Sequence, residues 1–256
     1  DILTTFARYV HHGMVPNMFP DEGTAPLYNT ADASLWYFYA VWQYLQYYPD
    51  TAANAFVQEN IYPHLKEIIS AYKNGTDFSI HMEEDGLIHA GSGLDQITWM
   101  DVRVGDWVAT PRHGKPVEIN ALWYNALKVM EEFARRYEED DDIPISGSHV
   151  MTSCDYAALA ELVRESFRQK FWWEEKGCLY DVVDGDEPDD HLRPNQIYAV
   201  SLPFTMLSKE QEARIVTFAK EHLYIGCGLR SLTCDHADYH GIYSGSLSKR
   251  DAAYHQ

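Results

Sequence analysis

The chain has 256 residues, and its 39 acidic and 20 basic side chains give a formal net charge of −19 at pH 7 with histidine neutral. A charge of this sign repels phosphate and argues against a nucleic-acid partner. Hydrophobic residues make up 46% of the sequence, which excludes a disordered chain, and no apolar run approaches the roughly 20 residues that cross a bilayer. We therefore expect a folded protein with neither nucleic acid nor membrane as partner.

Hydrophobic residues at helical spacing dominate the chain. Pro63 interrupts one such stretch and predicts a kink or a new helix start there. Ser208 and Gln211 have the spacing of a capping box, which marks the start of a helix. The predicted helices span residues 2–10, 31–48, 51–73, 116–137, 153–172, 194–207 and 208–223, and a further helix begins at Asp251.

Long segments separate several of these helices, at residues 14–30, 76–115, 177–194 and 224–250. Residues 76–115 mix glycine and proline with short β-like runs, so they predict a β-hairpin and a functional loop. The alternation of helices and long loops favours an all-α toroid that forms one domain over residues 1–256. A helical solenoid is less favoured, because no repeat of 34 or 40 residues is visible.

Aromatic residues reach 14% of the chain, with 18 Tyr and 7 Trp. Aromatic rings cover the CH faces of sugars, and carboxylate, amide and imidazole groups bond their hydroxyls. The composition therefore suits a neutral polyol ligand. The filling of a large helical core is the more common reason for such a composition.

The first candidate for chemistry is Asp101, in the run Thr98-Trp99-Met100-Asp101. Glycoside hydrolysis needs one protonated and one ionised carboxyl group, and apolar neighbours such as Trp99 raise a carboxyl pKa. Aspartate is also common in loops and turns without any catalytic role.

Other polar residues stand at the predicted helix starts. Glu118 and Asn120 open one helix, where the macrodipole keeps a carboxylate ionised and suits it to hydroxyl binding. Asp32 and Trp36 share a helix face, as a sugar clamp or as a first-turn acid beside a core ring. Further helix starts carry Asn195, Gln196, His255 and Gln256. The 12 histidines show no zinc-binding spacing, so no metal is predicted.

Over nearly its whole length the sequence resembles the amylo-α-1,6-glucosidase domain of glycogen-debranching enzymes. The resemblance rests on the segments FARYVHHGMVPNMFPD, YNTADASLWYFYAV, TWMD, TPRHGKPVEINALWYNAL, RPNQIYAVSLPF, GLRSL and RDAAYHQ. The segment TPRHGKPVEINALWYNAL is specific, whereas TWMD alone would be weak.

The resemblance implies an (α/α)6 toroid of twelve helices and hydrolysis, with inversion and without a cofactor, of the α-1,6-linked glucose left at a glycogen branch. It implies glycogen, limit dextrin or a related α-glucan as partner, and a cytoplasmic location. It places the general acid on Asp101. The implied glucose pocket consists of Asp32, Trp36, Trp99, Glu118, Asn120, Asn195, Gln196, His255 and Gln256.

The chain departs from the family at both ends. Seven helices and the start of an eighth are predicted where the family has twelve, so we expect a partial toroid. The family's first helix would precede Asp1, and its general base, a glutamate, would follow Gln256. An open ring would expose an apolar wall and favour self-association.

Two alternatives stay open. One keeps the toroid and changes the substrate, as in trehalases, glucoamylases or mannosyl-glycerate hydrolases. The other is a glucan-binding module without catalysis, since no residue of the chain is assigned as the base.

Overall fold

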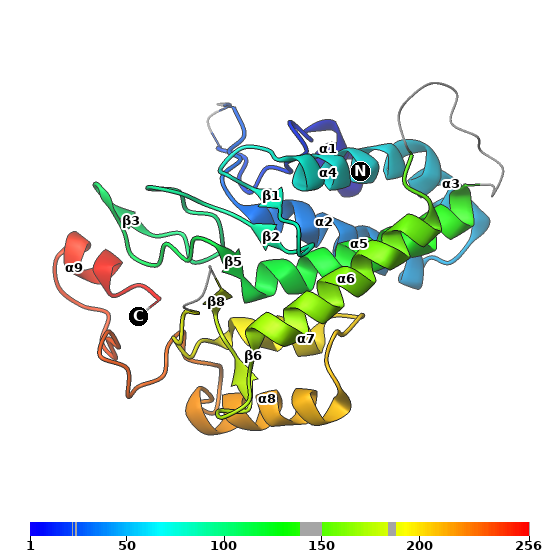
Figure 1. Ribbon diagram of the computed structural model, residues 1–256. Coiled ribbons are helices and arrows are strands. Elements are labelled where there is room, and N and C mark those ends of the chain that lie inside the picture. Colours follow the sequence, from blue (N-terminus) through cyan, green and yellow to red (C-terminus); the bar gives the residue numbers. More distant parts are fainter. Residues whose placement is uncertain (22, 24, 139–149, 184–187, 256) are drawn as a thin grey trace.

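Two long helices, α5 (Val117–Tyr137) and α6 (Ser153–Phe171), lie side by side at the centre of the computed structural model (Figure 1). The structure describes residues 1–21, 23, 25–138, 150–183 and 188–255. Helix α5 is buried over most of its length, including polar residues such as Glu118 and Asn120, and Trp123 at its middle is fully buried. Other segments of the chain cover nearly all of its faces, so α5 is the central element of the fold.

The N-terminal half forms four helices, which lie on one side of α5 (Figure 1). These are α1 (Ile2–Arg8), α2 (Ala31–Tyr47), α3 (Thr51–Asn60) and α4 (Tyr62–Asn74). Helix α2 packs directly on α5. The break between α3 and α4 confirms the predicted new start at Pro63, because proline lacks an N–H and is tolerated in the first turn of a helix.

Short strands pair in four antiparallel couples. The couples β1 (His81–Met82) with β2 (Ile88–His89) and β3 (Arg103–Val104) with β4 (Trp107–Val108) confirm the predicted hairpin insertion at 76–115. The strand β5 (Lys115–Pro116) pairs with β8 (Val182–Val183), and β6 (Trp172–Trp173) pairs with β7 (Cys178–Leu179). The β5–β8 pair brings Asp181, which comes just before β8, to the N-terminal end of α5.

Two predicted helices have different bounds in the structure. The helix predicted at 194–207 is only a 3-10 turn, η1 (Pro194–Ile197), and the short α7 (Tyr198–Ser201). It stops because Pro203 forces Leu202 into an extended conformation, with ψ at 155°. The helix predicted to begin at Asp251 is α9 (Leu247–Ala252), which instead follows Ser246 as its N-cap. The segment predicted as a loop at 177–194 contains β7 and β8.

The helix α8 (Lys209–His222) has the predicted capping box. The Ser208 hydroxyl accepts the Gln211 N–H at 3.2 Å, and the Gln211 side chain accepts the Ser208 N–H at 3.0 Å. We expect Ser208→Ala to lower the free energy of unfolding by about 1 kcal/mol, measured by urea denaturation, because one N–H of the first turn loses its partner. Ser246→Ala is the matched control, since Ser246 also stands at an N-cap but makes no capping hydrogen bond with its side chain. An equal loss in both variants would contradict the assignment.

Gly13 terminates the turn after α1 with φ at +72°, and a Cβ there would lie 2.1 Å from the Ala71 Cβ. Gly23 has nearly the same φ, +71°, but a Cβ at that position would meet no atom within 4 Å. Both Gly→Ala variants incur the cost of a left-handed alanine, about 1–2 kcal/mol. Gly13→Ala should lose about 1–3 kcal/mol more, because α4 cannot yield without repacking. Chemical denaturation of the two variants measures this difference, and equal losses would show that α4 moves freely.

Approximately half of the described residues are helical. No helix among them is long and apolar enough to cross a membrane. All four cysteines are free thiols.

Candidate active site

The loop that carries Asp101 is tied to the start of α2. The Ala31 N–H donates to the Ile97 carbonyl at 2.8 Å, and the Asn29 side-chain amide donates to the Gln96 carbonyl at 3.1 Å. These bonds bring Asp32, in the first turn of α2, close enough to Asp101 for the two carboxyl charges to repel. Two carboxyl groups that are distant in the sequence therefore lie close enough to interact electrostatically.

The pKa of each carboxyl group is raised. For Asp101 the cause is desolvation, opposed by a backbone hydrogen bond. Asp32 is only 9% exposed. Its pKa is raised by burial first and also by the charge of Asp101, against hydrogen bonds from Thr30 and the backbone that lower it. Asp101 is more accessible than Asp32 and is therefore the better placed of the two to give a proton to a ligand. The rise in its pKa has the direction that its apolar neighbours predict.

Arg112 organises the buried layer behind this loop. Its guanidinium donates to both carboxylate oxygens of Glu118, with Nη2 to Oε2 at 2.7 Å, and Nε donates to Asp181 Oδ2 at 2.5 Å. All three side chains are at most 2% exposed. The Arg112 backbone has φ at +46°, a left-handed conformation that arginine rarely adopts, and the ion pairs hold it there.

The same layer reaches the residues next to Asp101. Arg112 Nη1 donates to the Thr98 hydroxyl at 3.3 Å, and the Thr110 hydroxyl donates to the Met100 carbonyl at 3.1 Å. The Thr98 hydroxyl in turn accepts the Met100 N–H at 3.2 Å. The backbone immediately before Asp101 is therefore held by buried polar contacts.

Trp99 is held from the opposite side. Its indole N–H donates to Asn195 Oδ1 at 3.0 Å, and the Asn195 amide donates to Asp181 Oδ1 at 2.9 Å. The Trp99 ring remains 39% exposed and packs edge-on against His255, with ring centroids 4.9 Å apart. A half-exposed ring fixed in this way offers an apolar face to a ligand.

His255 carries an unused polar atom. Its Nε2 is buried and has no hydrogen-bond partner among the described residues. Burial, followed by the positive charges of Arg193 and Arg112, lowers its pKa to about 4. The ring is therefore neutral at pH 7, with one nitrogen that donates and one that accepts, as recognition of a hydroxyl requires.

Two predicted binding residues bond the main chain instead. Asn120 is fully buried and bonds Ile88 N, Ile88 O and Pro116 O. Gln196 accepts the Leu179 N–H and donates to the Arg193 carbonyl. Both side chains hold the loops together and present no polar atom to a ligand in this structure.

The structure thus brings together Asp32, Trp99, Asp101, Asn195 and His255, with Glu118 in the supporting layer. Trp36 joins the group through Tyr198, with ring centroids 5.4 Å apart. The pKa of Tyr198 is raised by burial and then by the charges of Glu118 and Asp32, so both carboxylates lie near its hydroxyl. Gln256 lies outside the described residues.

Sequence reasoning missed Tyr198 and Asp181. Asp181 is one of several acids in its segment, and nothing in the spacing separates it from the solvated ones. Its role depends on the β5–β8 pair, in which the Val117 N–H donates to the Asp181 carbonyl at 2.9 Å. Arg112 lies within the specific segment TPRHGKPVEIN, but Lys115 stands between the same two prolines, so the spacing does not distinguish Arg112 from it.

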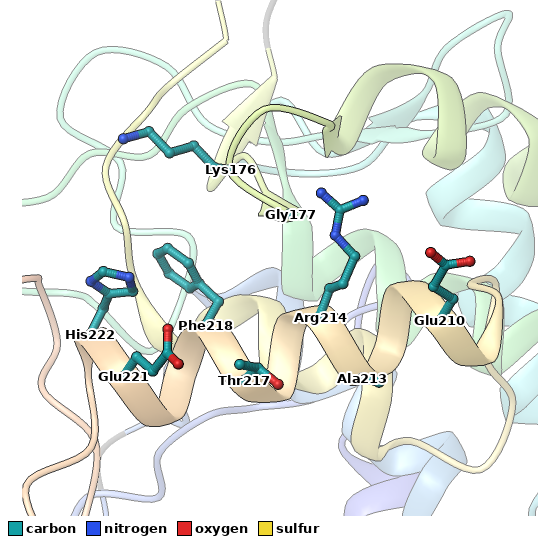
Figure 2. A pocket seen from close by; sticks show the side chains of 9 residues that line it. All are labelled: Lys176, Gly177, Glu210, Ala213, Arg214, Thr217, Phe218, Glu221 and His222. Atoms are coloured by element: carbon teal, nitrogen blue, oxygen red, sulfur yellow. The ribbon is translucent and has the colours of Figure 1, made fainter.

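A separate hollow of about 380 Å³ follows α8 (Figure 2). Figure 2 shows Lys176 and Gly177 facing the helix, with Arg214, Phe218 and His222 projecting from it. None of the lining residues is a predicted site residue. The Arg214 guanidinium donates to the Glu174 carboxylate at 2.8 Å, so the arginine of this hollow is already paired.

A helical fold with a carboxyl group of raised pKa beside an exposed tryptophan suits a helical glycosidase-type protein. Residues 1–256 match the amylo-alpha-1,6-glucosidase family over their whole length, and the chain belongs to this family.

Comparison with known proteins agrees with this family. The chain is 24% identical to the glycogen debranching enzyme of Saccharomyces cerevisiae over 338 aligned residues. The alignment covers 99% of this chain and 21% of that enzyme, so the chain spans about a fifth of the relative's length.

Two rhamnosidase structures have a related fold. The GH78 family rhamnosidase of Bacillus sp. GL1 has a TM-score of 0.54 at 19% identity, over 75% of this chain and 17% of that one. A rhamnosidase from Klebsiella oxytoca with rhamnose bound has a TM-score of 0.53 at 12% identity, over 82% of this chain and 34% of that one. The fold is thus shared with helix-rich glycosidases of the (α/α)6 class.

Proposed function

We propose that this chain acts in the hydrolysis of α-1,6-linked glucose at the branch points of glycogen or a limit dextrin, with Asp101 as the general acid. The observation that carries this proposal is the Asp101 carboxyl, whose pKa is raised by desolvation and whose loop is held by a buried ion-pair layer. A protonated carboxyl group in a fixed position is what protonation of a glycosidic oxygen requires. Membership of the amylo-alpha-1,6-glucosidase family supports the same substrate.

The surrounding residues divide into two roles within this proposal. Trp99 and Trp36 would cover the apolar faces of the glucose ring, and Asp32 and His255 would bond its hydroxyls. Glu118, Asn120, Asn195 and Gln196 would hold this pocket in shape, since their polar atoms are engaged with the protein. Gln256 is retained as a pocket residue from the resemblance alone.

The resemblance implies a glutamate as the general base, and none of the described residues is assigned to this role. Asp32 is a poor base, because the rise in its pKa by burial and by Asp101 disfavours the ionised form. Inversion requires the two carboxyl groups to stand about 6.5–9.5 Å apart. We extend the proposal to an (α/α)6 toroid of which this chain forms a part, and to a cytoplasmic location.

The substrate is tested by incubating the full chain with a limit dextrin trimmed by phosphorylase and transferase, and with a linear maltooligosaccharide of similar size. We expect glucose release from the limit dextrin only, with β-glucose as the first product in the proton NMR spectrum, because inversion converts the α-linkage. Release of α-glucose, or hydrolysis of the linear chain at equal rate, would contradict the proposal. Retention of glucan on the protein without any release would favour a binding module.

A further inference from the structure

Four side chains outside the candidate active site form a compact cluster, which we name the His191 cluster: Asp189, His191, His236 and Asp238. The rings of His191 and His236 lie 4.3 Å apart between centroids. Asp238 Oδ2 is 3.7 Å from His191 Nε2 and 3.8 Å from His236 Nδ1. One donor atom from each of His191, His236 and Asp238 can be chosen so that all three lie within 4.8 Å of one another.

We propose that the His191 cluster binds a zinc ion, with His191 Nε2, His236 and Asp238 as ligands and a water molecule in the fourth position. Two imidazoles and one carboxylate are a donor set that zinc accepts, whereas calcium and magnesium require oxygen ligands. Ligands bound tetrahedrally to zinc lie about 3.3 Å apart. The two distances to Asp238 exceed this value by about half an ångström, and the ligand nitrogens of the two histidines lie within 4.8 Å of each other. Side-chain rotation would bring the three ligand atoms to the separations that zinc requires.

The second carboxylate orients His191. Asp189 Oδ1 accepts the His191 backbone N–H at 2.9 Å and also faces His191 Nδ1 within bonding distance. When His191 Nδ1 carries the proton and donates it in a hydrogen bond to Asp189, the lone pair of the ring lies on Nε2 and points toward Asp238. A carboxylate on the far nitrogen of a histidine is the usual support of a metal ligand, because it fixes the tautomer and the ring direction.

His236 is oriented by its own turn. Its Nδ1 accepts the Asp238 backbone N–H at 3.1 Å, so the lone pair of this nitrogen already points toward Asp238. A bound ion would take that lone pair in place of the N–H. The two carboxylates of the cluster would neutralise the two charges of the ion, and both rings are half-buried, which leaves an entry path.

The backbone beneath the cluster is anchored on both sides. The Asp189 N–H donates to the Val182 carbonyl at 2.7 Å, next to the β5–β8 pair. The Thr233 N–H donates to the Leu192 carbonyl at 3.2 Å, and the His236 N–H donates to the Thr233 carbonyl at 3.2 Å. The ligand-bearing segments are therefore held together before any ion binds, which lowers the entropic cost of forming the site.

A zinc ion here would join residues 189–191 to residues 236–238. Arg193, two residues after His191, donates to the carbonyls of Ser231 at 3.1 Å and His255 at 2.6 Å. The ion would therefore strengthen a connection that the contact of Arg193 with Ser231 already makes nearby. The ligands were invisible as a motif because 44 residues separate His191 from His236.

The test is calorimetric titration of the metal-free full chain with Zn²⁺, and titration with Co²⁺ as a spectroscopic probe. We expect one ion per chain with a Kd of about 1 μM or tighter, visible absorption of tetrahedral Co²⁺, and a rise in Tm with Zn²⁺. His191→Ala and His236→Ala should each weaken binding by at least about tenfold, and Asp189→Asn by about 10–100-fold, through loss of ligand orientation.

Cys234→Ser is the matched control. Cys234 is exposed, lies two residues before the proposed ligand His236, and does not belong to the cluster. This variant should keep the wild-type stoichiometry and affinity. Absence of stoichiometric binding to the wild-type chain would overturn the proposal without any variant, and would leave Asp189, His191 and Asp238 as an ion-paired group. Equal affinity in the His191→Ala and control chains would overturn it as well.

Discussion

Replacement of Asp101 by Asn is expected to lower the rate of glucose release from a trimmed limit dextrin by about 10²–10⁴-fold, the usual contribution of a general acid. The amide cannot protonate the leaving oxygen, and it keeps the volume of the carboxyl group. The side chain is partly exposed and lies outside the ion-pair layer, so the free energy of unfolding should change little. Glucose assays and urea denaturation of the same preparations separate the two effects.

Asp106→Asn is the matched control, because Asp106 is an exposed aspartate in the turn between β3 and β4, five residues from Asp101. It should retain wild-type activity. The pH profile gives a second reading of Asp101. Since desolvation raises its pKa, the acid form should persist above the ordinary range of an aspartate, and activity should fall as pH rises through this raised value. An alkaline limb that survives in Asp101→Asn would assign that limb to another group.

Replacement of Arg112 by Met is expected to lower the free energy of unfolding by about 3–5 kcal/mol. The reason is that Glu118 would remain buried without its cationic partner, and Asp181 would keep only the more distant Arg193, whose Nε lies 3.8 Å away, and the Asn195 amide. An uncompensated charge in the interior costs more than the ion pair itself contributes. The free energy of unfolding of Arg112→Lys should lie between those of the wild type and Arg112→Met, because a lysine cannot donate to both oxygens of Glu118 while bonding Asp181. Chemical denaturation measures the three values.

Arg103→Met is the matched control for Arg112. The Arg103 side chain is exposed and donates from Nε to the Gly105 carbonyl at 2.7 Å, so its loss should change stability by less than about 0.5 kcal/mol. A loss of under about 1 kcal/mol in Arg112→Met would mean that water reaches Glu118 and Asp181. Indole fluorescence adds a reading of the site, because the Asp181–Asn195–Trp99 chain of hydrogen bonds should loosen in Arg112→Met alone.

The sequence alone predicted most helices, because their signals are local. The apolar stripe of α5, the capping box of Ser208 and the proline at the start of α4 each act within one or two turns of their own chain. The helix predicted at 194–207 is too long, because Pro203 restricts Leu202 to an extended conformation. This restriction is also local, since it acts between neighbouring residues.

The candidate acid and its ring, Asp101 and Trp99, were also predicted from the sequence, since an aspartate beside a tryptophan is visible as a motif. The roles of the polar helix-start residues were not separable in this way. Glu118 and Asn120 both stand in the first turn of α5, yet one pairs with Arg112 and the other with the backbone of Ile88. The partners come from other segments, so spacing along the helix cannot distinguish them.

The sequence by itself therefore determined the helical class, the family and the loop that carries Asp101. Only the tertiary structure decided which charges are buried and paired. Asp181 contacts Arg112 across 69 positions of the chain, and Trp99 contacts Asn195 across 96. The pKa of a carboxyl group depends on desolvation and on charges that lie close in space. Both are set when distant segments pack together, so no local pattern in the sequence encodes them.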